Sequence, residues 1–470
     1  MEAPPPPGRR KMRTSTLVAV LLVALAACGP APLPAKLPPG QASADPRDGG
    51  SPGVRHSGGF GDPGATTFSQ PRCDPQPGGV GQWKTVGNMV DAERIGGTAT
   101  VLDDGDILVV GGWMATGVDQ CGGPPRWGIA DIAERYSIAT GQWHRVATPL
   151  TIGRWYHTTT KLKDGRVLIA GGLWPEHEGY PYFCPTDIPA EIYDPDADTW
   201  TQTSPMHYQR AGAVAVLLAD GRVLVIGGTG SGSTEIYDPS RDTWTDAAPT
   251  QLDIEQAYPS GALLLRDGTV LAAGSDFRTG ALETEIYDPY LDEWRDERPL
   301  PIQKAGNLQE FSGIIMQPLP SGRVMVALRL DCLSGCYTSS SSSPPNHVVQ
   351  ETAYIEDPYT GIWSSTPPLP SITFDPASVV LSDGRILVAG GNTGWFATLT
   401  ASIFDEAFGA WRRAAEMPHS RENLLIVPLP GDAAFVLGGA EYCLRNGVVS
   451  GNNDLPVDRF HLDPLGVGSP

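Results

Sequence analysis

Aspartates spaced like metal ligands mark the stretch YDPDADTW, residues 193–200. Asp194, Asp196 and Asp198 stand at every second position, as carboxylates do in the first half of a calcium-binding loop. A true metal loop must keep its ligands wherever the chain repeats it. Whether this stretch recurs therefore decides between a metal site and an architectural element.

The stretch does recur, and its copies lose the acidic residues. Copies ending in Trp occur at 135–143 (RYSIATGQW), 236–244 (IYDPSRDTW), 286–294 (IYDPYLDEW), 355–363 (IEDPYTGIW) and 403–411 (IFDEAFGAW). The terminal Trp keeps its place, whereas the second and third acidic positions become Ser, Tyr, Leu, Thr or Ala. We therefore expect no metal here, but a turn between two strands, with Asp and Pro forming the turn and Tyr and Trp packing between units.

A second motif precedes these stretches and predicts the strands. Asp-Gly or a variant, then an apolar run and usually a Gly pair, begins at residues 104, 164, 220, 267, 321, 383 and 431. Asp-Gly favours a two-residue hairpin turn with positive φ at both central positions. The apolar run is short and rich in Val, Ile and Leu, which indicates a buried strand. The Gly pair lets the backbone pass where no side chain fits.

The two motifs together predict four strands per unit, repeated about every 50 residues. A double Gly with spaced Tyr and Trp at this period resembles the kelch repeat, whose unit is one blade of a β-propeller. We expect an all-β, seven-bladed kelch-type propeller of four-stranded blades over residues 73–470. Trp83 precedes the first Asp-Gly and the last unit, 458–464, lacks a Trp strand. The N-terminal strand near Trp83 should therefore close the ring.

The N-terminus predicts export and a lipid anchor. Residues 1–28 combine a basic stretch, an apolar run and the sequence LAAC, as in a signal peptide. LAAC resembles the lipobox of bacterial lipoproteins, which implies lipidation of Cys28; the alternative is an ordinary signal with an incidental Cys. By the same resemblance, Gly29 after the Cys implies sorting to the outer membrane, with the protein on its periplasmic or surface side. Residues 29–72 lack bulky apolar side chains and should form a disordered tether.

Charge and cysteine content limit the partners. The net charge of −20 argues against nucleic acid, which requires a basic face. Six cysteines remain besides Cys28, an even number for an oxidising compartment. Cys332 and Cys336 suggest a local disulfide, with a soft-metal site as the alternative. Cys73, Cys121, Cys184 and Cys443 allow three pairings, of which Cys121–Cys184 is preferred.

Arginines recur at the start of the predicted innermost strands. Arg94, Arg154 and Arg210 stand eleven positions before their turn Gly, and Arg421 holds the equivalent place in the last unit. They occupy blades 1, 2, 3 and 7, an arc beside the central channel. One interpretation is structural, with each Arg bonding carbonyls of the neighbouring blade. The other is a crescent that accepts an anion, because guanidinium groups match carboxylate and sulfate.

Residues 154–174, RWYHTTTKLKDGRVLIAGGLW, carry a further resemblance. An aromatic-Tyr pair opening the strand and a Trp after the Gly pair are similar to the galactose oxidase and glyoxal oxidase family of copper-radical enzymes. The resemblance implies Tyr156 as a copper ligand and Trp174 as a stacking ring. It fails at Gly96, where the family has a cross-linking Cys, and the family's Tyr-His pair has no counterpart. His157 follows Tyr156, but consecutive strand residues face opposite ways.

These observations favour a binding module over an enzyme. We expect a monomeric, lipid-anchored propeller that binds a protein, glycan or small anionic ligand, without a cofactor or metal. The binding face should be the one with the long loops 113–131, 173–188 and 330–350. The alternative is an oxidoreductase or other carbohydrate-active enzyme of galactose oxidase-like type. The candidate ligand contacts are Arg94, Arg154, Arg210, Arg421, Tyr156, His157 and Trp174.

Overall fold

The fold consists of strands and turns. A computed structural model describes residues 73–91, 94–117, 126–172, 189–228, 232–253, 261–276, 282–301, 308–332, 350–370, 373, 375–393, 396–445, 448–452 and 455–462. Within these ranges no helix has the length and apolar character needed to cross a membrane.

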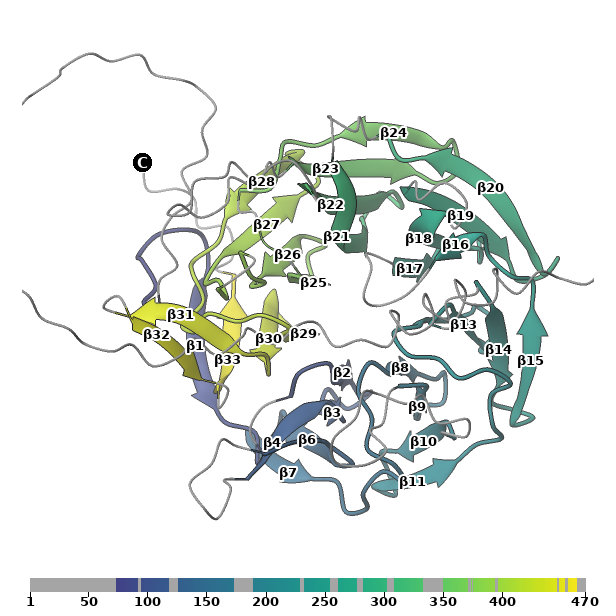
Figure 1. Ribbon diagram of the computed structural model, residues 1–470, viewed down its shortest axis with the longest axis horizontal. Helices are drawn as coiled ribbons and strands as arrows, with labels where there is room; N and C mark the ends of the chain where they lie inside the picture. The colour runs from purple at the N-terminus through teal and green to yellow at the C-terminus, as the bar shows by residue number, and fades with distance from the viewer. Residues whose placement is uncertain are drawn as a thin grey trace, which may run out of the picture. The chain divides into compact units, whose positions relative to one another are not determined.

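Seven antiparallel four-stranded sheets form the blades of a β-propeller, and Figure 1 looks down the ring. In each blade the strands are named from the innermost to the outermost. Blade 1 is β2 (Thr98–Val101), β3 (Ile107–Val110), β6 (Ala133–Ser137) and β7 (Gln142–Arg145). Blade 2 is β8 (Thr158–Lys161), β9 (Val167–Ala170), β10 (Glu191–Asp194) and β11 (Thr199–Gln202). Blade 3 is β12 (Val214–Leu217), β13 (Val223–Ile226), β14 (Thr234–Asp238) and β15 (Thr243–Ala247).

The remaining blades follow the same order. Blade 4 is β17 (Gly261–Leu264), β18 (Val270–Asp276), β19 (Leu282–Asp288) and β20 (Glu293–Pro299), and β16 (Leu252–Asp253) extends it beside β18. Blade 5 is β21 (Leu308–Pro318), β22 (Val324–Cys332), β23 (Gln350–Asp357) and β24 (Ile362–Ser365). Blade 6 is β25 (Ala377–Val380), β26 (Ile386–Ala389), β27 (Ala401–Asp405) and β28 (Ala410–Arg413). Blade 7 is β29 (Leu425–Leu429), β30 (Ala433–Leu437), β33 (Val457–His461) and β1 (Gln82–Gly87).

The N-terminal strand completes the last blade, as predicted. β1 pairs antiparallel with β33, with Trp83 opposite Phe460 and their rings 5.0 Å apart. The indole N–H of Trp83 also donates to the carbonyl of Ala415 at 2.8 Å. The innermost strands contact one another in sequence from β2 to β25, and both β2 and β25 contact β29. The ring is therefore closed by a blade that contains both ends of the propeller sequence.

The second strand of each blade carries the core. Ile107, Val167, Val223, Val270 and Ile386 each begin such a strand and have no exposed surface. Each strand packs between two neighbouring sheets, so the residues on both of its faces are apolar. Burying one such side chain stabilises the fold by about 1.5–3 kcal/mol, which makes these strands the main source of cohesion.

At four junctions, 1–2, 2–3, 6–7 and 7–1, the Gly pair joins one blade to the next. The N–H of Gly112 donates to the carbonyl of Arg154 at 2.8 Å, and Gly172 does the same to Arg210 at 2.7 Å. The first Gly of the pair leaves room for this approach, because a Cβ on Gly111 would lie 2.3 Å from the Arg154 oxygen. Gly391 with Arg421 and Gly439 with Arg94 repeat the bond at 2.8 and 3.3 Å. We call this bond the inter-blade clasp.

The Asp-Gly turns differ from the expected type. Gly105 has a φ of 86°, but Asp104 is not among the residues with positive φ. The N–H of Gly105 donates to the carbonyl of Leu102 at 3.1 Å, so a turn of three residues precedes the glycine. The Asp side chain accepts the N–H of Asp106 at 2.9 Å. The two-residue prediction was wrong because this carboxylate stabilises a longer turn, with only the glycine left-handed.

The stretch 193–200 forms the predicted turn, between β10 and β11. Asp194 accepts the N–H groups of Asp196 and Ala197. Asp198, at φ 53°, accepts the hydroxyl of Tyr193 at 2.7 Å and the N–H of Ala147 from the preceding blade at 3.0 Å. Asp194 and Asp198 thus accept hydrogen bonds from groups of the protein, and Asp198 links blades 1 and 2.

Candidate functional site

The four arginines are buried within their own blades. Arg94 has no exposed surface, and its guanidinium donates to Glu134 Oε1 at 2.6 Å and to the carbonyls of Ile132 and Gly111 at 2.9 and 3.2 Å. Glu134 in turn accepts the N–H of Val90 at 2.6 Å. Side chain, carboxylate and backbone therefore form one network that holds the entrance of the innermost strand to the third strand.

The same network occurs in the other three blades. Arg154 pairs with Glu191 at 2.5 Å, Arg210 with Glu235 at 3.0 Å and Arg421 with Asp458 at 2.9 Å, all buried. Burial lowers the pKa of Arg154, and Glu191 opposes this effect. Burial alone would raise the pKa of Asp458, but His419 and Arg421 hold it below its ordinary value. Each arginine thus has an acidic partner, which stands two residues before the Tyr or Phe of the third strand. This recurring acidic residue is the sequence signal that could have identified the pairs.

This geometry favours the structural interpretation of the arginine arc. The bonded carbonyls belong to the same blade, not to the neighbouring blade as expected, because each Arg turns back onto the third strand of its own sheet. The Nε atoms of Arg94, Arg154 and Arg421 have no partner among the described residues. These atoms are buried, so an anion would reach them only if strands moved apart.

A left-handed residue stands two positions after each of these arginines and after Thr373, the equivalent residue of blade 6. Gly96, Tyr156, Gly212, Asp375 and Asn423 have φ values of 66°, 54°, 72°, 47° and 53°. The turn is thus a requirement of the blade, found at the equivalent place in blades 1, 2, 3, 6 and 7. A residue with a Cβ costs about 1–2 kcal/mol in this conformation. Tyr156 therefore holds an aromatic ring where the neighbouring blades use glycine.

Tyr156 lies at the junction of three blades. Its N–H donates to the carbonyl of Gly96 at 2.9 Å, and its carbonyl accepts from Gly212 at 2.8 Å. Its ring stacks on Trp155 with centroids 4.3 Å apart, and Trp155 meets Trp113 edge-on at 5.1 Å. A Cβ on Gly96 would lie 3.3 Å from the Tyr156 ring. Glycine at 96 thus lets the stacked rings pack against the neighbouring blade.

His157 lies apart from that stack, between blades 1 and 2. It is 3% exposed, and its Nε2 is 2.9 Å from the hydroxyl oxygen of Thr98. Burial and the charges of Arg154 and Arg94 lower its pKa to about 3, so the imidazole is neutral at physiological pH. One step along the strands, Thr100 donates to Thr159 at 3.1 Å. Polar pairs therefore line this contact between two blades.

The residues around Tyr156 do not fit a copper ion. Copper(II) prefers several nitrogen and oxygen ligands, yet Gly96 faces the ring and His157 is bonded to Thr98. Among the described residues, the one cluster of three His, Cys, Asp or Glu side chains at ligand distance is His207, Glu235 and Asp246 in blade 3. Its Glu235 already accepts Arg210 and the N–H of His207. The described residues around Tyr156 thus offer a copper ion too few ligands.

Several predicted residues lie outside the described part of the chain. They are Cys28, Cys121, Trp174, Cys184 and Cys336. For Cys332 the structure describes only the backbone, at the end of β22. Cys73 is disulfide-bonded and 4% exposed. The predicted pairs Cys332–Cys336 and Cys121–Cys184 remain predictions.

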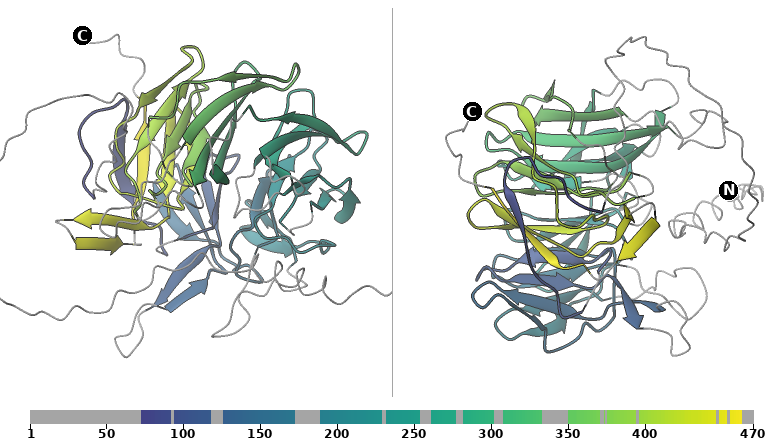
Figure 2. Two further views of the ribbon diagram at one scale, coloured as in Figure 1. Left: turned by 45° about the horizontal axis from the view of Figure 1, so that its top comes forward. Right: turned by 90° about the vertical axis from the view of Figure 1, so that its left-hand side faces the viewer.

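Two hairpins rise from one face of the ring. They are β4 (Trp113–Gly117) with β5 (Arg126–Ile129), and β31 (Glu441–Arg445) with β32 (Val448–Asn452). Figure 2 shows both, in blue and yellow, projecting to the same side of the propeller. Matching pairs anchor them after the Gly pair: Ile95 with Trp113 and Glu422 with Ala440. Part of the predicted loop 113–131 is thus an ordered hairpin.

Comparisons with known proteins agree with this fold. Residues 94–150, which form blade 1, match the family model described as Kelch motif. The chain is 32% identical over 108 residues to "Kelch repeat and BTB domain-containing protein 12" of Danio rerio, and 27% identical over 154 residues to "Kelch-like protein terF" of Aspergillus terreus. These alignments cover 22% and 32% of this chain, but only 16% and 31% of the relatives.

A solved structure extends the comparison to most of the chain. It is a fungal alcohol oxidase of the AA5 family in complex with copper, with a TM-score of 0.57 and 18% identity over 82% of this chain and 76% of that one. At this identity the similarity concerns the fold alone. Motif, blade count and fold similarity agree: the described residues form a seven-bladed β-propeller of the kelch type.

Proposed function

We propose that this protein is a binding module that takes a protein partner on the face carrying the two hairpins. The kelch motif supports a role in protein interaction, and the described residues present no assembled catalytic constellation. The observation that carries the proposal is the pair of hairpins on adjacent blades 7 and 1. Both leave the ring immediately after the Gly pair and are held there by equivalent backbone pairs.

The frame beneath the hairpins is rigid, which suits recognition. The inter-blade clasp from Gly439 to Arg94 joins the two blades that carry them. Their cores also merge, because Ile107 and Val109 of blade 1 pack with Phe435 and Leu437 of blade 7. A partner bound across both hairpins would therefore rest on two blades that are bonded to each other, and preorganisation of such a frame favours affinity.

The location is part of the same proposal. The sequence LAAC supports lipidation of Cys28, with the propeller held outside the cytoplasm on the outer membrane. The variant Cys28→Ser should move the protein from the membrane fraction to the soluble fraction. Unchanged membrane association of this variant would exclude the lipid anchor without affecting the proposed binding face.

The binding face is tested by replacing one hairpin at a time. Chemical crosslinking in cells of the natural host should yield a specific adduct with the wild-type protein. Replacing residues 441–452 by a short Asn-Gly turn should remove that adduct. The control is Tyr290→Ser, which changes a side chain 80% exposed on the opposite face. An adduct that survives the hairpin replacement but is lost in the control would place the partner on the wrong face for this proposal.

A copper oxidase is the second candidate, suggested by the fold similarity and by Tyr156 at the position of the family's ligand Tyr, although Gly96 stands where that family has its Cys. Metal analysis of the purified propeller separates the two. The binding-module proposal expects substoichiometric copper after incubation with Cu(II) and removal of the excess. One tightly bound copper per chain, lost in Tyr156→Phe, would favour the oxidase.

A further inference from the structure

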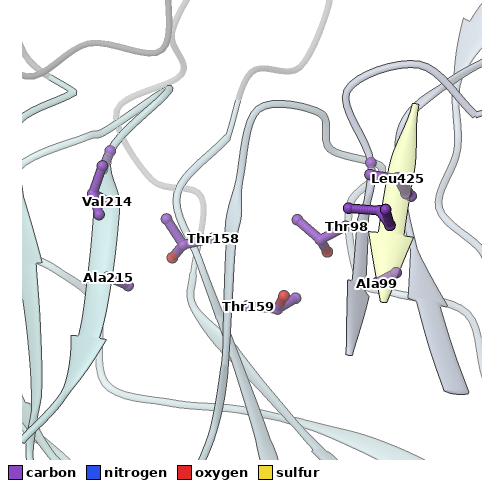
Figure 3. Close-up of a pocket in the computed structure, with 10 residues that line it drawn as sticks. Thr98, Ala99, Thr158, Thr159, Val214, Ala215 and Leu425 are labelled. Carbon is purple, nitrogen blue, oxygen red and sulfur yellow. The ribbon is translucent and has the colours of Figure 1, made fainter. Parts of the chain in front are cut away.

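An open pocket of about 320 Å³, which we call the cavity, lies where the innermost strands of blades 7, 1, 2 and 3 face one another. Figure 3 shows Thr98, Thr158 and Thr159 between Val214 on one side and Leu425 on the other. The lining residues come from β2, β8, β12 and β29 and the residues just before them, and none is charged. The volume is at the lower end of the range of small-molecule sites, about 300–1,000 Å³.

The walls offer hydroxyl groups whose bonds are only partly used. Thr159 accepts a hydrogen bond from Thr100 at 3.1 Å, which leaves its own proton to donate. Thr158 donates a long bond of 3.4 Å to the carbonyl of Ala170, which leaves its oxygen to accept. Thr98 shares one bond with His157. A hydroxyl has one donor and two acceptor sites, so the cavity can both donate to a ligand and accept from it.

The charges behind the walls cancel. Arg94, Arg154, Arg210 and Arg421 stand just before the strands that line the cavity, and each pairs with a buried carboxylate. His157, between β2 and β8, is neutral at physiological pH. An ionic ligand would therefore find no unpaired opposite charge on the lining residues, whereas a neutral ligand needs none.

The remaining walls are apolar and small. Val214, Leu425 and Ile426 offer methyl groups, and glycine and alanine at 97, 99, 213 and 215 keep the space open. Such a surface contacts C–H groups well, while the threonines on the other side contact hydroxyl groups. A sugar ring has both C–H faces and hydroxyl groups, so the apolar and the threonine walls of the cavity can each contact one of them.

We propose that this cavity binds a small uncharged molecule with several hydroxyl groups, such as a neutral monosaccharide or polyol. The site is separate from the proposed protein-binding face and from the buried arginines. It replaces the expected anionic ligand by a neutral one, since the hydroxyl groups and the absence of charge on the lining residues select it.

The test uses the full propeller and a panel of neutral sugars and polyols, with glucuronate and glucosamine as charged counterparts. Methyl NMR signals of Val214, Leu425 and Ile426 should shift saturably with at least one neutral compound and not with its charged counterpart. Thr158→Val keeps the side-chain shape and removes one hydroxyl. This variant should bind that compound with about fivefold lower affinity, because one neutral hydrogen bond is lost.

Thr245→Val is the matched control. Its hydroxyl donates to the carbonyl of Ile236 at 3.4 Å, the same kind of bond as that of Thr158, but on the outermost strand of blade 3. It should leave the affinity unchanged. A panel in which no neutral compound shifts these signals, a preference for glucuronate, or equal binding by Thr158→Val and wild type would each overturn the proposal. None of these results would change the crosslinking of a protein partner, so the proposed binding face is tested separately.

Discussion

The N–H of Gly112 donates a 2.8 Å hydrogen bond to the carbonyl oxygen of Arg154, and this bond joins blade 1 to blade 2 at the centre of the ring. The same Arg154 side chain bonds the carboxylate of Glu191 in its own blade. One residue thus links two blades through its backbone and two strands of one blade through its side chain. The Gly pair and the opening Arg, which look independent in the sequence, serve one junction.

Substituting the first glycine should separate steric conflict from backbone strain. Gly111→Ala places a Cβ 2.3 Å from the Arg154 oxygen at a φ of 57°, whereas Gly409→Ala meets nothing within 4 Å at a φ of 58°. Both incur the left-handed penalty of about 1–2 kcal/mol, and only Gly111→Ala must also break the clasp. Urea denaturation should show a clearly larger loss for Gly111→Ala. Equal losses would mean that the clasp contributes nothing.

Removing a buried arginine should destabilise the fold through its orphaned partner. Arg154→Met leaves the Glu191 carboxylate buried without its cation, at a cost of about 3–5 kcal/mol. The double variant Arg154→Met/Glu191→Gln removes both charges and should recover much of the loss. The measurement is the free energy of unfolding of both variants. A double variant no more stable than the single one would contradict the role of the ion pair.

Small anions should not stabilise the wild-type protein. Uronates, sulfated sugars and dicarboxylates would have to displace a carboxylate from each buried arginine. Thermal melts with these compounds should therefore match melts at equal ionic strength in sodium chloride. An anion that raises the melting temperature of wild type, but not that of Arg154→Met, would restore the ligand-binding interpretation of the arginine arc.

His207 should titrate above its ordinary range. Its Nδ1 lies 2.7 Å from Asp246 Oδ1, and this hydrogen bond raises the pKa of His207. A raised folded pKa contributes stability that is complete below the unfolded value of about 6.5 and is lost as the pH rises through the folded pKa. The gain is small because both side chains are about half exposed. An NMR titration should show a lower pKa in Asp246→Asn; an unchanged pKa would exclude the pair.

The closing strand should be required for stability, and the segment before it should not. Deleting residues 73–90 removes β1 and exposes an edge of β33, which favours aggregation. Deleting residues 29–70 leaves β1 and Trp83 in place. The comparison is the melting temperature and the monomer fraction of the two truncated proteins, each matched to the intact propeller. Two equally stable truncations would contradict closure by β1.

The repeat was readable because its chemistry is local. Trp200, the Gly pair and the Asp of the turn satisfy needs within one blade or at the next blade, so most copies carry them, and the order of the strands can be read from their spacing. The offset of Trp83 was enough to predict the closing strand. The turn type was mispredicted because the carboxylate of Asp104 competes with the two-residue geometry, a choice that residue types alone do not reveal.

The side-chain partners were harder to predict, since they depend on direction. The positions of Arg94 and Arg154 were found, but whether a long side chain turns to the channel or to its own third strand is decided by Glu134 and Glu191, some 40 positions later. The cavity was invisible for a related reason. It results from small residues on four strands that are far apart in the sequence, and no sequence motif indicates that small side chains will lie together there.

The segment before β1 also decides how the molecule bears mechanical load. The N–H of Gln76 donates to Glu416, and Val80 exchanges hydrogen bonds with Arg413 and Ala415. A force applied to the chain before residue 73 therefore acts first on Cys73 and on these hydrogen bonds to the end of blade 6, and only then on β1. When the propeller is pulled from its N-terminal side, the hydrogen bonds of Gln76 and Val80 should therefore break first, while the pairing of β1 with β33 stays intact.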